Sequence, residues 1–439
     1  MTLRVGLAII AAKAASLIIK LFRFGAGATW PGEIALILSP DILKALAPQL
    51  SKGIILVAGT NGKTTTSLMI KTILEKQGYS VIHNASGANL ANGVVSACIQ
   101  QSSWNGGIHA DYGVFEVDEN SLGGVMTNAK CQMLNGKQKL IVVLLNLFRD
   151  QLDRYGEVDV IAEKWGKALR ALDRKNITLI VNADDPGVAY LGRDWGGGIM
   201  YFGLNEPKNF LKVAEHATDS TFCINCGARL TYDGIYYSHI GIWHCEKCGQ
   251  KRPRPDIDAW PSPLPGLYNQ YNTLAAVATA RLLGIADEKI KQALSGFAPA
   301  FGRQEEFTVD GKTIKIFLSK NPAGFNASLR TVLELKPKIL LLVFNDRIPD
   351  GRDVSWIWDV DFEMLSHDER KIFVSGDRAY DLGLRLKYAD VSCTGVYGDL
   401  REAIGKALTA VKGGETLYIL PTYSAMLEVR KILGGRKIL

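Results

Sequence analysis

One short stretch of this sequence, residues 54–66, constrains the fold more than any other. Its apolar run 54–58 predicts a buried parallel strand, and Gly59 and Gly62 bracket a turn before a helical pattern that opens at Lys63. A strand, a glycine-rich turn and a helix N-terminus together form an anion site, because free backbone N–H groups and the helix dipole both face a bound phosphate. The stretch therefore predicts a nucleotide-binding α/β domain.

The side chains of this turn suit the phosphates of a nucleotide. Lys63 is placed to reach the terminal phosphates, and the Thr64 hydroxyl is placed to hold Mg²⁺. The general phosphate-loop motif has glycine where this chain has Val57, so the sequence over 58–66, AGTNGKTTT, is a variant of it. The residues of the loop that we expect to bind ATP are Thr60, Asn61, Gly62, Lys63, Thr64 and Thr65.

Length and composition indicate a globular protein of two or three domains, since the chain has 439 residues. Hydrophobic residues make up 47% of it and charged residues 22%. The formal charge of +7 is modest. It fits anionic substrates or surfaces and does not by itself argue for nucleic acid.

Four of the seven cysteines form two CxxC pairs with the spacing of a zinc ribbon. The predicted ligands are Cys223, Cys226, Cys245 and Cys248. Four thiolates leave no open position on the ion, so the site is predicted to be structural, within an insertion of about 207–255. His239 and His244 lie nearby in sequence and are expected to be surface groups. An odd number of cysteines suggests reduced thiols, and hence a cytosolic location.

The first 23 residues predict a helix with one basic stripe on an otherwise apolar surface. The stripe consists of Lys13, Ser16, Lys20 and Arg23. Two lysines inside the run argue against a membrane-spanning helix. Two interpretations stay open: a helix packed on the body of the protein, or a helix lying on an anionic membrane surface.

Polar residues lie at the carboxyl ends of three predicted strands, within the segments 112–120, 140–156 and 177–186. Ligands of open α/β sheets bind at the carboxyl ends of the strands, so these residues are candidates for a common site. Glu116 lies between apolar neighbours, where an unpaired charge is costly. We expect Mg²⁺ to be its partner, with a structural salt bridge as the alternative. Residues 86–93, which are small or Asn-rich, are suited to lining a substrate cleft.

The segment 264–276 is predicted to begin a helix that runs to about residue 283. Asn269 and Asn272 lie on one face near its start, where they either cap the helix or contact a purine edge. Arg303 closes this central domain and is free to reach a phosphate. From residue 306 strands and helices alternate again, which predicts a separate doubly wound domain. The strands are expected at 312–318, 338–344, 371–375, 391–396 and 415–420, and the helices near 323–334, 377–388, 399–411 and 423–433.

With these residues in view, the chain resembles the Mur ligase family over nearly its whole length. The resemblance rests on the segments AGTNGKTTT (58–66), FEVDE (115–119), NLFRDQLDRYG (146–156), NADDP (182–186), GLYNQYNTLAA (266–276) and GR (302–303). The four-cysteine insertion and the segments SKNPAGFNASL (319–329) and DGRDVSWIWD (350–359) are typical of one amide-forming branch of that family.

The resemblance implies an α/β fold in three parts. These are an N-terminal helical segment (1–50), a P-loop central domain (51–305) carrying the inserted Cys₄ zinc ribbon, and a C-terminal Rossmann-like α/β domain (306–439). It also implies roles: Lys63 for the ATP phosphates, Thr64 and Glu116 for magnesium, and Asn272 for adenine. Arg303 joins this predicted ATP-binding set.

The resemblance further implies ATP-dependent amidation of the α-carboxyl of D-glutamate in the lipid II stem peptide, in peptidoglycan synthesis. Ammonia would come from a partner chain, a GatD-type glutamine amidotransferase that contacts the C-terminal domain. That partner would supply Cys and His, and Asp353 would complete the triad; Asp350 and Asp359 are the alternatives. No convincing Cys-His pair occurs in this sequence, which agrees with a separate glutaminase. The expected location is cytoplasmic, with possible association at the inner face of the membrane.

Two departures from the family pattern matter. Only about fifty residues precede the phosphate loop, too few for the domain that binds a UDP-sugar, so a nucleotide-linked sugar substrate is disfavoured. Gln151 also stands where the family often has a metal-binding His. Two alternatives remain open, a folylpolyglutamate-synthase-like ligase and a zinc-ribbon ATPase that binds nucleic acid. For the second, the basic residues Lys247, Lys251, Arg252 and Arg254 are a thin patch.

Overall fold

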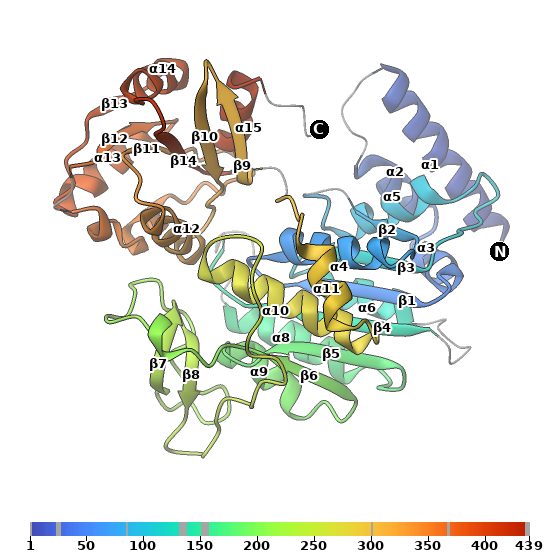
Figure 1. Cartoon of the computed structure of the whole chain (residues 1–439). Coiled ribbons are helices and arrows are strands. Elements are labelled where there is room, and N and C mark those ends of the chain that lie inside the picture. The colour runs from blue at the N-terminus through green and yellow to red at the C-terminus, as the bar shows by residue number, and fades with distance from the viewer. Residues whose placement is uncertain are drawn as a thin grey trace.

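The computed structural model describes residues 2–22, 28–84, 87–130, 138–150, 158–299, 302–366 and 369–434. Two six-stranded sheets and one hairpin organise the chain (Figure 1). The first sheet has the order β2-β3-β1-β4-β5-β6, and all of its strand pairs are parallel. Its strands are β1 (Gly53–Ala58), β2 (Val81–His83), β3 (Tyr112–Val117), β4 (Lys139–Leu144), β5 (Ile177–Asn182) and β6 (Gly198–Phe202).

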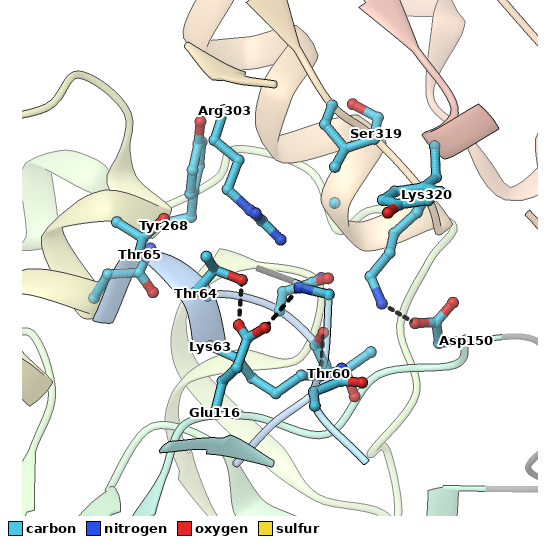
Figure 2. A pocket seen from close by; sticks show the side chains of 18 of the residues that line it. Thr60, Lys63, Thr64, Thr65, Glu116, Asp150, Tyr268, Arg303, Ser319 and Lys320 are labelled. Atoms are coloured by element: carbon cyan, nitrogen blue, oxygen red, sulfur yellow. Dashed lines mark hydrogen bonds and ion pairs between the residues drawn. The ribbon is translucent and has the colours of Figure 1, made fainter. Parts of the chain in front are cut away.

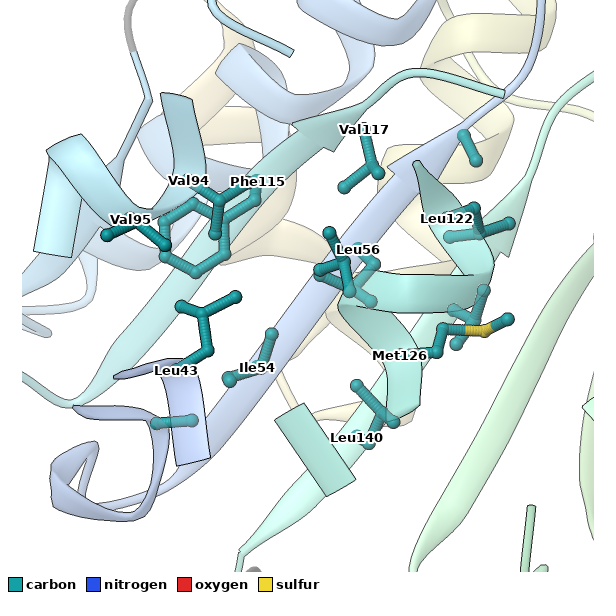
Figure 3. Close-up of a cluster of buried hydrophobic side chains, with 14 of the residues drawn as sticks. Leu43, Ile54, Leu56, Val94, Val95, Phe115, Val117, Leu122, Met126 and Leu140 are labelled. Carbon is teal, nitrogen blue, oxygen red and sulfur yellow. The ribbon is translucent and has the colours of Figure 1, made fainter. Parts of the chain in front are cut away.

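Helices cover both faces of this sheet, so both faces are apolar and the strands are continuous hydrophobic runs. Every residue of β1 and β3 is buried. On one face Leu56, Phe115 and Leu140 pack with helices of the first half of the chain (Figure 3). On the other face Val57 and Val143 pack with α4 and α10. The helices around the sheet are α4 (Lys63–Lys76), α5 (Ala91–Gln101), α6 (Leu122–Lys130), α8 (Val158–Arg170), α9 (Pro186–Arg193), α10 (Leu267–Leu282) and α11 (Asp287–Leu294).

The residues before β1 form the helices α1 (Leu3–Phe22), α2 (Trp30–Leu38) and α3 (Ile42–Leu46). α1 lies at an outer edge of the molecule beside α2 and α5 (Figure 1). One of its faces is buried in the central core through Val5, Ala8, Ile9 and Ala12, so the helix packs on the body of the protein. No described helix is both long enough and apolar enough to cross a membrane.

The predicted basic stripe of α1 is not an exposed stripe. Lys13 donates a hydrogen bond from Nζ to the backbone oxygen of Ser102, its Nζ lies 5.8 Å from the ring centre of Trp104, and Ser16 is buried. At these two positions the stripe therefore turns toward α5 and the body of the protein. Arg23 lies outside the described residues.

The second sheet has the order β13-β12-β11-β14-β10-β9 and is parallel except for β9, which runs antiparallel to β10. Its elements are β9 (Arg303–Val309), β10 (Lys312–Phe317), α12 (Pro322–Glu334), β11 (Ile339–Val343), β12 (Lys371–Ser375), α13 (Ala379–Tyr388), β13 (Gly395–Tyr397), α14 (Leu400–Ala410), β14 (Thr416–Pro421) and α15 (Tyr423–Ile432). The alternation predicted from residue 306 onward is confirmed, but β13 starts at Gly395 and not at residue 391.

Arg303 opens strand β9, so it belongs to the second sheet and not to the end of the central domain, as the sequence had suggested. Its Cα pairs with Phe317 of β10. Because Arg303 is part of the second sheet, its guanidinium reaches the central sheet from the C-terminal domain.

A two-stranded hairpin, β7 (Thr231–Tyr237) and β8 (Ile240–His244), carries the two CxxC segments at its open end. It lies at one side of the central sheet, near α9 and β6 in Figure 1. Its second strand contacts the residues after β5: Gly241 N donates a hydrogen bond to the backbone oxygen of Asp184 at 3.0 Å, and Trp243 Nε1 donates one to that of Ala183 at 3.0 Å.

Candidate active site

The phosphate loop has the geometry that its glycines predict. Gly62 has a φ of 90° and immediately precedes α4. A Cβ at this position would lie 2.1 Å from Asn272 Oδ1, so a side chain cannot be accommodated. The turn between β1 and α4 therefore brings the backbone N–H groups of the first helical turn to the surface of a cavity, where an anion can be bound.

Lys63, Thr64 and Glu116 meet at the base of this cavity (Figure 2). Thr64 Oγ1 donates a hydrogen bond to Glu116 Oε2, and Gly87 N donates to Glu116 Oε1 at 2.9 Å. Lys63 Nζ donates to Glu119 Oε2 at 3.2 Å and to backbone oxygens of the loop. A buried hydroxyl beside a buried carboxylate is a ligand set suited to Mg²⁺, which prefers oxygen donors.

Residues that follow strands of the central sheet form the rest of the cavity floor. Only two of the three predicted strands contribute such residues. β3 leads to Asp118 and Glu119, and β4 leads to Asn146 and Asp150, all of which line the cavity. Residues 182–186 after β5 are not among its lining residues.

The two aspartates that follow β5 are buried in structural contacts instead. Asp184 accepts hydrogen bonds from Arg252, from Leu204 N and from Tyr271. Asp185 caps α9 through Val188 N and accepts from Leu147 N. The expectation of a ligand at this third strand end is therefore wrong, because the inserted hairpin and α10 take up both carboxylates.

The C-terminal domain closes the cavity from the opposite side. Lys320, just before α12, forms an ion pair with Asp150 of the central domain. Asn61 and Asn321 exchange two side-chain hydrogen bonds, at 3.2 and 3.0 Å, which join the phosphate loop to the N-terminus of α12. Burial lowers the pKa of Lys320, but Asp150 and Glu119 outweigh it and raise the pKa above its ordinary value. Lys320 therefore stays charged at neutral pH.

Arg303 also points toward the centre of the cavity, above Thr64 and Glu116 (Figure 2). Within the described parts of the chain no carboxylate lies within ion-pair distance of its guanidinium. Arg303, Lys320 and Lys63 together place three cations around one space, which suits a polyphosphate.

The cavity between the two domains has a volume of about 360 Å³. Asn269 and Asn272 line it, and Asn272 Nδ2 donates to Asn269 Oδ1 at 3.2 Å. No side chain caps the N-terminus of α10. The predicted capping role of Asn269 and Asn272 is therefore not the one they have in the structure. All the predicted ATP-binding residues line this cavity, namely Thr60, Asn61, Gly62, Lys63, Thr64, Thr65, Asn272 and Arg303. Residues 87–90 line it as well, whereas Gln151 lies outside the described residues.

The sequence indicated no role for Tyr268 or Lys320, which also line the cavity. Lys320 could have been recognised by its place in a polar segment directly before Asn321 and Pro322, which read as the start of a helix. Its partner Asp150 could not, because a pair 170 positions apart in sequence leaves no local signal.

The four predicted cysteine ligands come together in a second, separate cluster. All four sulfur atoms lie within 4.8 Å of one another. The two CxxC segments have matching turns: Gly227 N donates to Cys223 O at 2.8 Å, and Gly249 N donates to Cys245 O at 3.0 Å. The cluster is thus built from two equivalent halves.

His239 is fully buried, so its predicted place on the surface is wrong. Its ring packs 5.0 Å from Phe148, and its Nε2 lies 3.3 Å from Asp185 Oδ2. The tight turn of the hairpin inserts this residue into the core, where Asp185 provides the polar partner. His244, by contrast, is partly exposed and lies 3.7 Å from Asp233.

Asp353 is exposed on the C-terminal domain and is not one of the residues that line the cavity. Hydrogen bonding by the Ser355 side chain and backbone lowers its pKa, so the carboxylate is ionised at neutral pH. The two alternatives are engaged elsewhere. Asp350 is buried and accepts from Ser424 N at 2.8 Å, and Asp359 forms an ion pair with Arg149 at 3.3 Å.

Two protein families match this chain, and one of them covers the phosphate loop and the other residues of the central domain. Residues 57–280 match the family described as Mur ligase middle domain, and residues 318–426 match the one described as MurT ligase C-terminal. A Staphylococcus aureus protein named lipid II isoglutaminyl synthase (glutamine-hydrolyzing) subunit MurT is 37% identical over 83% of this chain and 84% of its own length. This chain belongs to the MurT branch of the Mur ligase family. A Streptococcus pneumoniae protein of the same name is 32% identical over 100% of this chain and 99% of its own.

Solved structures show the same fold. A pseudomurein peptide ligase type C from Methanothermus fervidus superposes with a TM-score of 0.67, at 24% identity over 88% of this chain and 79% of that one. Mycobacterium tuberculosis folylpolyglutamate synthase with ADP gives 0.57, at 15% identity over 91% and 95%. The Mur ligase family uses ATP and Mg²⁺, which agrees with the phosphate loop and with the Thr64–Glu116 pair. This member of the family is a ligase.

Proposed function

We propose that this ligase amidates the α-carboxyl of D-glutamate in the lipid II stem peptide and so forms D-isoglutamine during peptidoglycan synthesis. The observation that carries the proposal is the match to two proteins named as subunits of lipid II isoglutaminyl synthase, over 83% and 100% of this chain. The phosphate cavity at the domain boundary adds the chemistry that such a reaction requires.

The reaction needs an activated carboxyl group, because hydroxide is a poor leaving group and phosphate a good one. The substrate carboxylate would attack the γ-phosphorus of ATP, forming an acyl phosphate and releasing ADP. Ammonia would then add to the acyl carbon, lose a proton and expel phosphate, leaving the amide. Lys63, Arg303 and Lys320 would stabilise the negative charge on the transferring phosphoryl group, which is the main catalytic task in such a step.

Thr64 and Glu116 would hold the magnesium ion that accompanies ATP, and Asn272 would contact the adenine. Bound there, the ion would neutralise charge on the phosphate oxygens. The residues present fit it, because Glu116 is 1% exposed and holds both carboxylate oxygens at the cavity floor beside a hydroxyl.

The four-cysteine cluster fits a structural zinc ion. A tetrahedral ion with Zn–S distances of about 2.3 Å places its sulfur atoms about 3.8 Å apart. Here Cys223 Sγ and Cys248 Sγ are 3.6 Å apart, and Cys226 Sγ and Cys245 Sγ are 3.5 Å apart. All four positions would be occupied by thiolates, so the ion would stabilise the inserted hairpin and would not touch substrate.

We further propose that ammonia comes from a GatD-type glutaminase bound to the C-terminal domain, and that Asp353 orients the catalytic histidine of that partner. An exposed, ionised carboxylate outside the ATP cavity suits this role. Pro349 of the same loop lines the cavity. Four residues span at most about 14 Å, so the two reaction centres would be close neighbours.

We propose three parts for the chain: an N-terminal helical segment (1–50), a central ATP-binding domain from residue 51, with the ribbon at about 207–255, and a C-terminal domain. The boundary expected at 305/306 moves to the start of β9, because Arg303 belongs to the second sheet. We also propose that the protein works in the cytoplasm, at the inner face of the membrane that carries lipid II.

The proposal is tested by incubating the chain, with its glutaminase partner, with lipid II, Mg-ATP and either glutamine or ammonium. Conversion of a carboxylic acid to an amide lowers the mass of the stem peptide by about one dalton. Omitting ATP is the control. ATP consumption without this mass change, or a gain equal to an added amino acid, would reject amidation and favour a folylpolyglutamate-synthase-like ligase.

A further inference from the structure

The outer side of α1 carries a continuous row of exposed apolar side chains, which we call the α1 face. It consists of Leu3, Leu7, Ile10, Leu17, Ile18, Leu21 and Phe22. Between 49% and 83% of each of these residues is exposed. The neighbouring helix α2 adds the exposed residues Trp30, Ile37 and Leu38. Single exposed apolar residues are ordinary, but a row along a helix of 20 residues is a surface that binds something.

The α1 face is not the side by which α1 packs against the rest of the chain. The opposite side of α1 is already buried, through Ala8, Ile9 and Ala12, against α2 and α5. The start of α1 is also fixed to the end of α2, because Arg4 Nε donates to the backbone oxygen of Leu38 at 2.6 Å. The helix is therefore held in place with its apolar row turned outward.

Charge decides between the possible occupants of this face. α1 has no acidic residue, and although Lys13 turns toward Ser102, the side chain of Arg4 is exposed at the start of the helix. In a pair of such helices from two copies of the chain, neither α1 would offer an acidic side chain to a basic one beside the apolar row. Paired helices normally place opposite charges there. An anionic lipid surface, in contrast, attracts cations beside an apolar helix face.

We propose that the α1 face lies in the surface of an anionic lipid bilayer, with the helix axis parallel to the membrane. The apolar side chains would enter the boundary between headgroups and acyl chains, while the buried side of α1 keeps the body of the protein attached. The helix does not qualify as a membrane span, which agrees with a position in the membrane surface.

The start of the neighbouring helix α2 lies at the rim of the catalytic cavity. Thr29 and Leu90 line that cavity, and Trp30, the next residue after Thr29, is 68% exposed. A protein held by α1 would thus present the rim of its cavity near the lipid surface. This step rests on the proposed function, since a substrate with a lipid anchor would deliver its carboxylate at that place.

The test uses vesicles without lipid II, made of phosphatidylcholine with or without phosphatidylglycerol. We expect the full chain to sediment with the anionic vesicles, and the double variant Leu7→Gln/Leu17→Gln to bind them at least about tenfold more weakly. The matched control is Val213→Gln, which changes an exposed apolar residue of the inserted segment and leaves binding unchanged. Thermal melting and ATP hydrolysis verify that each variant is folded.

A second measurement does not require loss of binding. A polarity-sensitive fluorophore on Leu17→Cys should shift to the blue when anionic vesicles are added, and the same label on Val213→Cys should not. Equal sedimentation of the double variant and the parent, or no spectral shift at position 17, would overturn the proposal. The proposal would also be overturned if the parent chain did not bind vesicles but formed a dimer, and if Leu7→Gln/Leu17→Gln dissociated that dimer. Because these vesicles contain no substrate, a failure of amidation leaves the result intact.

Discussion

Glu116 and Lys63 are the residues on which phosphoryl transfer should depend most. Glu116 is held by Thr64 and by Gly87 N, and Lys63 is 7% exposed beside Glu119. We expect Lys63→Met and Glu116→Gln to lower kcat for ATP-dependent amidation by about 100-fold or more, since each removes a charge at the transferring phosphate. The control is Lys71→Met, a partly exposed lysine on the same helix. Parental rates in both variants would show that the phosphate site lies elsewhere.

His83 should make stability depend on pH. Burial, the largest cause, lowers its pKa from 6.5 to about 4, and the nearby Lys71 acts in the same direction. The unfolded chain takes up this proton near pH 6.5 and the folded chain only near pH 4. Stability is therefore fully present above the unfolded pKa and is lost as the pH falls from about 6.5 toward 4. His83→Gln should lose less stability than the parent between pH 7 and pH 5 in urea unfolding. His109→Gln, at an exposed position, is the control. An unchanged pH dependence in His83→Gln would contradict this assignment.

At the scale of single elements, the inserted hairpin should be stabilised by one zinc ion. Cys226→Ser/Cys248→Ser should remove the bound metal and lower the melting temperature by roughly 5 °C or more, since metal binding is part of the folding free energy. Cys393→Ser, which changes a partly buried cysteine of the C-terminal domain, should retain the metal. Metal content measured by mass spectrometry together with thermal melting gives the answer. A metal-free parent with the same melting temperature would refute the ribbon.

Local sequence signals predicted the elements whose chemistry is local. The strand, glycine turn and helix over 53–76 follow from burial, from a glycine with positive φ and from the open helix end. The two CxxC turns are likewise read from spacing alone. His239 and the residues after β5 were misplaced, because their burial depends on how the hairpin docks onto the sheet. Which side of α1 faces solvent was left open for the same reason, since periodicity gives the stripes of a helix but not the one that faces solvent.

At the scale of the whole molecule, the catalytic cavity exists only because two domains meet. The pairs Lys320–Asp150 and Asn61–Asn321 cross the boundary beside the phosphate loop. The inserted segment adds a third crossing, in which Arg330 Nε of the C-terminal domain lies 2.8 Å from Glu215 Oε1. The sequence could predict each domain but not these pairs. Their consequence is that the C-terminal domain contributes Lys320 and Arg303 to the lining of the cavity, whereas Asp353 of the same domain is not among the lining residues.

The last prediction follows from the position of Asp353, which does not line the cavity of the phosphate loop. A glutaminase with only Cys and His lacks the acid that orients the imidazole and stabilises its protonated form as the thiol loses its proton. Asp353 is exposed and ionised, whereas Asp350 is held by Ser424 and Asp359 by Arg149.

We therefore expect Asp353→Asn in the complex to remove glutamine-dependent amidation, by about 100-fold or more by analogy with other triads. Ammonium-dependent amidation should persist, because Lys63, Thr64 and Glu116 are untouched. Asp359→Asn is the matched control and should keep both activities. If Asp353→Asn lost ammonium-dependent activity equally, the residue would belong to the ligase site or to the fold. If it lost neither, the partner would carry its own acid, and the loop would serve only as a contact surface.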